Sequence, residues 1–219
     1  MHFELYIEDI SGKELLEILV PKIISSSNST FRAYHYKGIG EIPKDLHKSP
    51  DPKKQLLLNK LPAILRSYGK WSIPDALTVI VVVDCDKRDC LTFKQELLNV
   101  LNNCEPKPFA FFRIAIEEIE AWLLGDKAAI KKAYPKMNQR EYAEYKQDYV
   151  CGTWEKLADI TLSRDVAKYL KNPNTAYFDI GRQKIEWMQK IGANMDINNN
   201  SSPSFNCFKR KLQELANEQ

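Results

Sequence analysis

Hydrophobic and polar positions along the chain follow two patterns, short apolar runs and segments with helical spacing. Four runs of apolar or alternating residues predict β-strands, at 3–7, 31–38, 78–83 and 108–117. Helical spacing follows the first run, where Leu15, Leu19 and Ile23 share a face, and it returns after the third and fourth runs. Strands that alternate with helices predict an α/β fold with a mainly parallel central sheet flanked by helices.

The remaining segments are predicted to be mainly helical. A helical pattern covers 53–68, where Pro62 is expected to interrupt or kink the helix. Further helices are predicted at 118–134, 174–195 and 204–215. The chain is therefore expected to divide into an α/β core at 1–126 and a helical C-terminal extension at 127–219 that packs on this core.

The distribution of charge points to two basic clusters. The net charge is only +3 over 219 residues, so the chain as a whole is not a polycation. Seven lysines and arginines lie between Lys44 and Lys70. Six more are Lys127, Lys131, Lys132, Lys136, Arg140 and Lys146. The clusters are either solvated helix faces or contacts to a nucleic-acid backbone, since clustered cations displace counterions from phosphates.

The cysteine content and the absence of long apolar runs indicate the cellular setting. Five cysteines show no paired spacing of the kind that zinc sites use. Their odd number and the lack of a signal peptide predict free thiols in a cytoplasmic protein. No apolar run approaches the ~20 residues that cross a bilayer, so no membrane partner is expected.

Acidic residues follow three of the four predicted strands. The first is followed by Glu8, the third by Asp84 and Asp86, and the fourth by Glu117, Glu118 and Glu120. The carboxyl ends of parallel strands form the functional crevice of open α/β sheets. Carboxylates gathered there repel one another unless a cation neutralises them. Because oxygen-only ligand sets suit Mg²⁺ or Mn²⁺, the sequence predicts a divalent metal site.

Each acid also has a purely structural interpretation. Glu8 or Asp9 can start a helix, Asp84 can cap one, and one of the three glutamates is expected on the surface. Alternation along an extended chain predicts that Asp84 and Asp86 point to one side while Cys85 packs inward. The residues alone leave open which of Glu117, Glu118 and Glu120 would bind a metal.

Four stretches of the chain carry a resemblance to a known fold. They are IEDISGKELL, VVVDCDKRDCLTFKQEL, RIAIEEIEAWLLGD and NNNSSPSFNCFKRKLQEL. In this order, from Leu5 to Leu215, they resemble a bacterial family with the Toprim fold of topoisomerases, primases and overcoming-lysogenization-defect nucleases. Genes of that family often lie beside genes for AAA-type ATPases in phage-defence contexts. The resemblance implies a Toprim-like α/β fold, a nucleic-acid substrate and an AAA-type ATPase partner.

The resemblance also implies which residues form the site. Glu8 matches the Toprim glutamate, Asp84 and Asp86 match the metal-binding pair, and Glu118 and Glu120 match an E-x-E-x-W motif. All five are candidate catalytic residues. Glu8, Asp84, Asp86 and Glu118 are the candidate ligands of Mg²⁺ or Mn²⁺.

Four further residues are candidates for binding the scissile phosphate. Gly12 matches the glycine of the loop after the Toprim glutamate, and Lys13, Lys87 and Arg113 supply positive charge. The leading hypothesis is a Toprim-type endonuclease in which two cations activate a water and stabilise the leaving oxygen of DNA or RNA. It is expected to act as the effector subunit of a phage-defence system.

Two other functions remain open. The protein can be a non-catalytic sensor or interaction subunit of an ATPase complex, in which C-terminal aromatic residues form the interface. Most of these aromatics are expected in the core: Trp154, Tyr169, Tyr177, Phe178, Trp187, Phe205 and Phe208. The third hypothesis is a metal-dependent phosphotransferase or phosphatase. In such enzymes the D-x-D motif follows the first strand, whereas here it follows the third. Each of the three hypotheses is compatible with a homo-oligomer.

Overall fold

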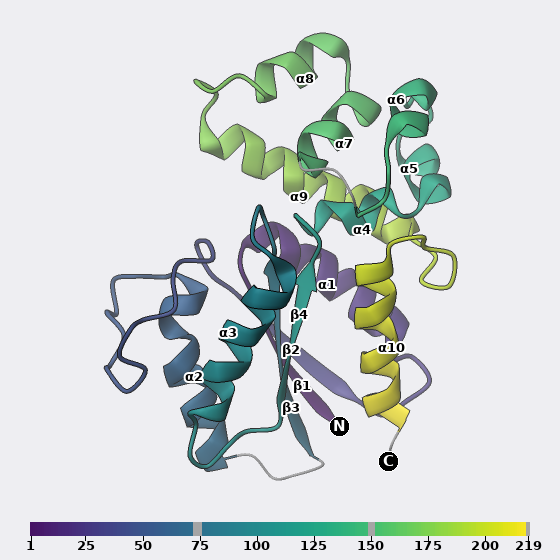
Figure 1. The fold of residues 1–219 in the computed structure, drawn as a ribbon. Coiled ribbons are helices and arrows are strands. Elements are labelled where there is room, and N and C mark those ends of the chain that lie inside the picture. The colour runs from purple at the N-terminus through teal and green to yellow at the C-terminus, as the bar shows by residue number, and fades with distance from the viewer. Residues whose placement is uncertain (72–75, 149–151, 218–219) are drawn as a thin grey trace.

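A four-stranded parallel sheet forms the centre of the protein (Figure 1). The computed structural model describes residues 1–71, 76–148 and 152–217. The strands are β1 (His2–Ile7), β2 (Thr30–His35), β3 (Leu77–Asp84) and β4 (Ala110–Ala115). Their order across the sheet is β2-β1-β3-β4, and every neighbouring pair is parallel. The predicted α/β class with a parallel sheet flanked by helices is confirmed.

The two central strands are buried on both faces. In β1, Leu5 lies opposite Ile80 of β3, and both pack into one hydrophobic core. Tyr6 and Val81 point to the other face and belong to a second core. This alternation explains why the sequence of β3 is uniformly apolar, because side chains on both faces must be covered.

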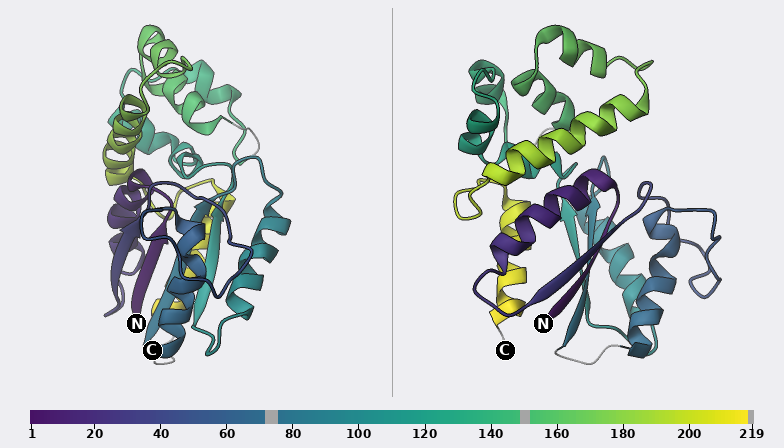
Figure 2. Two further views of the ribbon diagram at one scale, coloured as in Figure 1. Left: turned by 90° about the vertical axis from the view of Figure 1, so that its left-hand side faces the viewer. Right: turned by 180° about the vertical axis from the view of Figure 1, so that it is seen from behind.

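Helices cover each face of the sheet (Figures 1 and 2). The first core contains α1 (Ile10–Ile23) and α10 (Pro203–Asn217). The second contains α2 (Leu57–Trp71) and α3 (Cys90–Asn102). A helix from the end of the chain therefore completes a layer that begins with the first helix.

The remaining helices stand beyond the carboxyl ends of the strands, at the top of Figure 1. They are α4 (Glu120–Leu124), α5 (Lys127–Ala133), α6 (Gln139–Glu144), α7 (Thr153–Thr161), α8 (Arg164–Leu170) and α9 (Tyr177–Asn194). Figure 2 shows α9 beside α1, where Gly192 approaches Leu15. Trp122 of α4 stacks on Phe208 of α10 at 5.2 Å. The C-terminal helices thus share one core with the α/β part.

Several helix boundaries differ from the prediction. Pro62 does not interrupt α2, which begins at Leu57 and continues past it to Trp71. The helix expected at 118–134 is divided at Gly125, because Asp126 caps a new helix through the backbone N–H of Ala129. A Cβ at Gly125 would lie 2.1 Å from Oδ1 of Asn200, so this close approach requires glycine.

The described part of the chain has free thiols at Cys85, Cys90, Cys104 and Cys207. Cys85 is 3% exposed, which confirms that it packs inward. Cys151 lies outside the described residues. Among the helices of the described ranges, none combines the length and apolar composition needed to cross a membrane.

Candidate active site

The strand order places a topological reversal point between the carboxyl ends of β1 and β3. The chain leaves β1 for β2 on one side, and later returns to β3 on the other side. Ligands of open α/β sheets bind at such a reversal point, outside the carboxyl ends of the strands. Glu8 directly follows β1, and Asp84 is the last residue of β3. The sheet therefore brings two predicted acids to this point.

Glu8 lies in an environment that disfavours its negative charge. Burial, followed by the charges of Asp86 and Asp9, raises its pKa to about 7. A backbone hydrogen bond at Asp84 and the charge of Lys184 lower this pKa only in part. Oε2 of Glu8 is buried and has no hydrogen-bond partner among the described residues. A buried, unpartnered carboxylate oxygen is a position where a cation would be stabilised.

Asp84 belongs to the same crowded group. Burial raises its pKa well above the usual range, and the charges of Glu8 and Glu120 raise it further. Lys184 acts in the opposite direction. The two strands therefore hold Glu8 close enough to Asp84 for its charge to destabilise the charged form of Asp84.

Asp86 reaches the group by a different backbone path from the one expected. β3 ends at Asp84, and Asp86 has a left-handed conformation with φ of 49°. The alternation predicted for an extended chain is therefore wrong at this position. The backbone N–H of Asp86 donates to the carbonyl oxygen of Glu117 at 2.8 Å, which ties together the loops after β3 and β4. Asp86 is exposed, and its charge still raises the pKa of Glu8.

The three glutamates after β4 have different partners. Glu117 accepts hydrogen bonds from the backbone N–H groups of Gly152, at 2.6 Å, and Thr153, at 2.9 Å. Its carboxylate therefore stabilises the start of α7. Glu118 accepts from the backbone N–H of Trp154 at 3.3 Å. Glu120 is fully buried.

Lys184 of α9 neutralises part of this acidic group and was not predicted. Its Nζ lies 3.2 Å from Oε1 of Glu118 and 3.2 Å from Oε1 of Glu120. The contact with Glu120 is an ion pair without hydrogen-bond alignment. Burial lowers the pKa of Lys184, but the surrounding carboxylates raise it by more, so that it stays charged.

Two acids share this one lysine, so their negative charge is only partly compensated. Burial, and then Glu120, raises the pKa of Glu118 to about 8, although Lys184 lowers it. Burial also raises the pKa of Glu120. A signal for Lys184 exists in the sequence, because it takes the first position of an i, i+3, i+4, i+7 stripe whose other members are buried. Those members are Trp187, Met188 and Ile191.

Gly12 and Lys13 have structural partners near the site. Gly12 lies in the first turn of α1 and not in a loop, and its N–H donates to Oδ1 of Asp9 at 2.8 Å. A Cβ on Gly12 would lie 2.7 Å from Cγ2 of Ile7, so close packing accounts for the glycine. Lys13 pairs with Glu17 at 2.8 Å. Asp9 is therefore the helix-starting acid, and Glu8 remains available to the site.

The other two candidate phosphate-binding residues lie in different places. Lys87 is exposed in the loop after β3, next to Asp86. Arg113 lies within β4, and burial lowers its pKa, while charges at Cys207, Glu214 and Arg210 of α10 act on it. Its guanidinium stands 4.7 Å from the ring centroid of Phe111. The structure thus places Lys87 in the exposed loop next to Asp86 and Arg113 beside α10.

The donor chemistry of the acidic group suits a hard divalent cation. Glu8, Asp84 and Asp86 supply only oxygen ligands, and their repulsion is what a cation would relieve. In the described ranges, no three Asp, Glu, His or Cys side chains converge as a metal-binding group. Binding a cation would therefore require these side chains to turn toward one another. Glu118 and Glu120 are already occupied by Lys184.

Comparisons with protein-family models, with curated proteins and with solved structures find no match to this chain. The class that the fold defines is an α/β protein with a group of acids at the reversal point of a parallel sheet. The Toprim-like resemblance stays a prediction. The parallel sheet and the acids after β1 and β3 are consistent with it.

Proposed function

We propose that this protein is a Mg²⁺- or Mn²⁺-dependent nuclease that hydrolyses phosphodiester bonds of DNA or RNA. One observation carries the proposal. Glu8 and Asp84 are held together at the reversal point of the sheet, with strongly raised pKa values and an unpartnered buried oxygen. Carboxylates in this state gain most from a divalent cation, and perturbed acids in a crevice are typical of functional sites.

The three acids nearest the reversal point would hold the cation. Glu8, Asp84 and Asp86 are the proposed ligands, and a bound cation would supply an activated water and charge stabilisation for the leaving oxygen. The occupation of Glu118 and Glu120 by Lys184 favours one cation over the two expected from the sequence. These two glutamates would hold Lys184 near the reacting phosphate.

Cations in the loop after β3 would bind the substrate phosphate. Lys87 is exposed beside Asp86, so its ammonium is available to an anion at the reversal point. The guanidinium of Arg88 instead lies 4.6 Å from the ring centroid of Phe93. Lys87 is therefore the stronger candidate for neutralising charge on a scissile phosphate.

A second candidate function is that of a non-catalytic interaction subunit. Tyr177 and Phe178, adjacent at the start of α9, are 92% and 74% exposed. Tyr169 is also exposed, whereas Trp187, Phe205 and Phe208 are buried as expected. Adjacent exposed aromatics are typical of protein interfaces. They also suit the AAA-type ATPase partner that the Toprim-like resemblance implies, in which case the nuclease would be the effector of a defence complex.

Divalent-dependent cleavage separates these two functions. Purified protein is incubated with plasmid DNA, single-stranded DNA and RNA in Mg²⁺, Mn²⁺ or EDTA. We expect cleavage of at least one substrate, lost in EDTA and in Glu8→Gln. Glu214→Gln on α10 removes a carboxylate that pairs with Lys211, and it should cleave normally. Cleavage that survives Glu8→Gln contradicts the site, and no cleavage under any condition supports the interaction subunit.

A further inference from the structure

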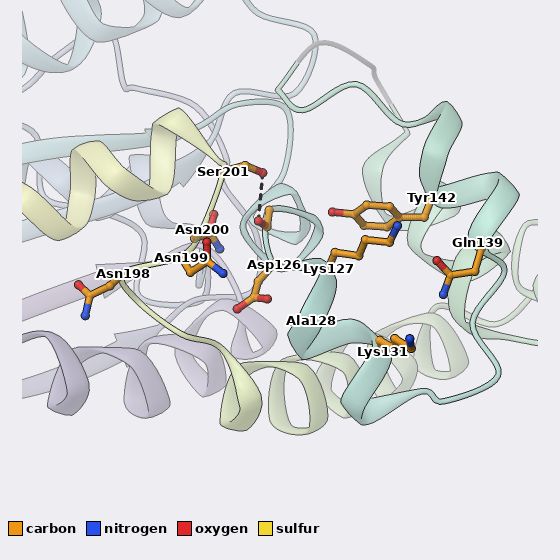
Figure 3. Close-up of a pocket in the computed structure, with 11 residues that line it drawn as sticks. Asp126, Lys127, Ala128, Lys131, Gln139, Tyr142, Asn198, Asn199, Asn200 and Ser201 are labelled. Atoms are coloured by element: carbon orange, nitrogen blue, oxygen red, sulfur yellow. Dashed lines mark hydrogen bonds between the residues drawn. The ribbon is translucent and has the colours of Figure 1, made fainter.

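A hollow separate from the carboxylates lies between α5, α6 and the loop that precedes α10 (Figure 3). Its volume is about 620 Å³. Lys127 and Lys131 of α5, Gln139 and Tyr142 of α6, and the loop at 198–201 line it. None of these residues takes part in the site described above. The size and polar lining raise the question of which ligand it suits.

Positive charge dominates this hollow. Lys127 and Lys131 are exposed, and the acids of α6 pair with other cations, Glu141 with Lys156 and Glu144 with Arg140. The one acid in the lining is Asp126, which is 2% exposed. Its two oxygens accept from the backbone N–H groups of Ala129 and Asp196, each at 2.9 Å. Asp126 therefore stabilises the backbone and leaves the two lysines to an external anion.

The wall opposite the lysines is held in place by buried hydrogen bonds. Asn200 donates to the carbonyl oxygen of Trp122 at 2.8 Å and accepts from the N–H of Ser202 at 2.8 Å. Ser201 donates to the carbonyl oxygen of Gly125 at 3.0 Å. These bonds present the exposed amides of Asn198 and Asn199 at the rim. Two ammonium groups and neutral amide donors in the lining of one hollow suit a phosphate group.

The aromatic residue in the lining is not free to stack on a base. The ammonium of Lys127 lies 5.2 Å from the ring centroid of Tyr142, and the Tyr142 hydroxyl donates to the carbonyl oxygen of Leu124 at 2.8 Å. A mononucleotide would therefore gain little from its base. Exposed cations continue outside the hollow at Lys132, Lys136 and Arg140. This extension favours a polyanion over a small phosphate ligand.

The hollow is also close to the acidic group along the chain. Glu120 begins α4, and Gly125 directly follows the end of this five-residue helix. At 1.5 Å per residue, α4 separates the two by about 8 Å, or roughly two nucleotide rises of 3.4 Å.

We infer that the hollow formed by Lys127, Lys131 and the 198–201 loop binds backbone phosphates of a nucleic acid, as the substrate of the proposed nuclease. This inference rests on the proposed nuclease function for its purpose, but binding can be measured without cleavage. Each lysine contacts one phosphate and releases its counterions. The contact is independent of base sequence, since only phosphate oxygens are recognised.

The test compares Lys127→Gln/Lys131→Gln with Lys94→Gln/Lys107→Gln. The control pair removes the same charge from exposed positions on α3 and in the loop that follows it, outside both basic clusters of the sequence. Fluorescence anisotropy with labelled single-stranded DNA, duplex DNA and RNA in EDTA gives affinity at several salt concentrations. We expect at least tenfold weaker binding for the first pair, with the slope of log affinity against log salt reduced by about 1.4 to 1.8. The control pair should match the wild type.

Added inorganic phosphate tests whether a small anion is sufficient, and thermal melts verify that both pairs fold. Displacement of DNA by millimolar phosphate in wild type, but not in Lys127→Gln/Lys131→Gln, would assign the hollow to free phosphate and overturn the inference. Equal affinities and slopes in both pairs would also overturn it, as would a wild type that binds no nucleic acid. Lysine-dependent binding without cleavage keeps this inference and refutes the nuclease.

Discussion

The acidic group at the carboxyl edge of the sheet consists of two halves that differ in their counter-charge. Glu118 and Glu120 lie 3.2 Å from Lys184. Glu8 and Asp84 have no such close cation among the described residues, whereas burial and neighbouring acids raise the pKa in both halves, to about 7 for Glu8 and to about 8 for Glu118. Carboxylates of similar burial therefore differ in whether a cation already contacts them, and our proposal assigns the bound metal ion to the half that Lys184 does not contact.

The two halves also come from different parts of the fold. The sheet supplies Glu8 and Asp84, whereas α9 supplies Lys184 from the C-terminal helices. A buried charge is tolerated when a partner compensates it. The C-terminal extension is thus part of the acidic group, because its Lys184 pairs with one half of it.

Removing Lys184 should have the largest effect on stability. Lys184→Met leaves Glu118 and Glu120 buried without their cation, and breaking a buried pair in this way costs about 3–5 kcal/mol. Urea unfolding monitored by circular dichroism measures the loss. Lys190→Met, which removes an exposed lysine paired with Glu186, is the control and should change stability by less than about 1 kcal/mol.

A double variant tests the cause of this loss. If uncompensated charge destabilises Lys184→Met, then adding Glu120→Gln should recover part of the stability. Additive losses in the double variant would show that Lys184 acts through packing of its methylene chain, and the comparison between the two halves would fail.

Removing an acid from the half that contains Glu8 and Asp84 should increase the stability of the protein, whereas Lys184→Met decreases it. Asp84→Asn relieves repulsion with Glu8 and Glu120, so we expect the free energy of unfolding of metal-free protein to increase. Asp165→Asn on exposed α8 is the control and should stay within about 0.5 kcal/mol. A loss of stability in Asp84→Asn would mean that Asp84 is a structural cap.

The pH dependence of stability gives a smaller effect with a defined sign. The pKa of Glu8 rises from 4.5 to about 7 on folding, so native protein binds more protons than unfolded protein between these values. Its contribution to stability is therefore lost as pH rises from about 4.5 to about 7. Urea midpoints in metal-free buffer should fall less steeply over this window for Glu8→Gln than for wild type. Identical slopes would contradict the raised pKa.

The half of the site built by the sheet could be predicted from sequence, and the other half could not. Uniformly apolar residues identified β3, and the rule that parallel strands end at a common crevice placed Asp84 beside Glu8. Lys184 lies 66 residues from Glu118, and no local pattern reports a contact over this separation. Its position in a helical stripe of buried residues indicates that Lys184 is buried. Only the fold shows which acids it contacts.

The backbone conformation of the loops also could not be predicted from the sequence. Asp86 was expected to continue an extended chain, but its left-handed φ follows from the hydrogen bond between its N–H and Glu117 across two loops. Gly12 was expected in a loop, yet Asp9 caps α1 early and draws it into the first turn. Both differences arise from contacts between side chains or loops that periodicity does not describe.

Binding of Mn²⁺, followed by electron paramagnetic resonance of the free ion, tests the central claim most directly. We predict one site per chain in the wild type, lost in Glu8→Gln and in Asp84→Asn, and retained in Glu118→Gln, whose side chain already faces Lys184. Wild-type protein that binds no Mn²⁺, or a site that survives Glu8→Gln and disappears in Glu118→Gln, would contradict the assignment of the cation to the Glu8 and Asp84 half.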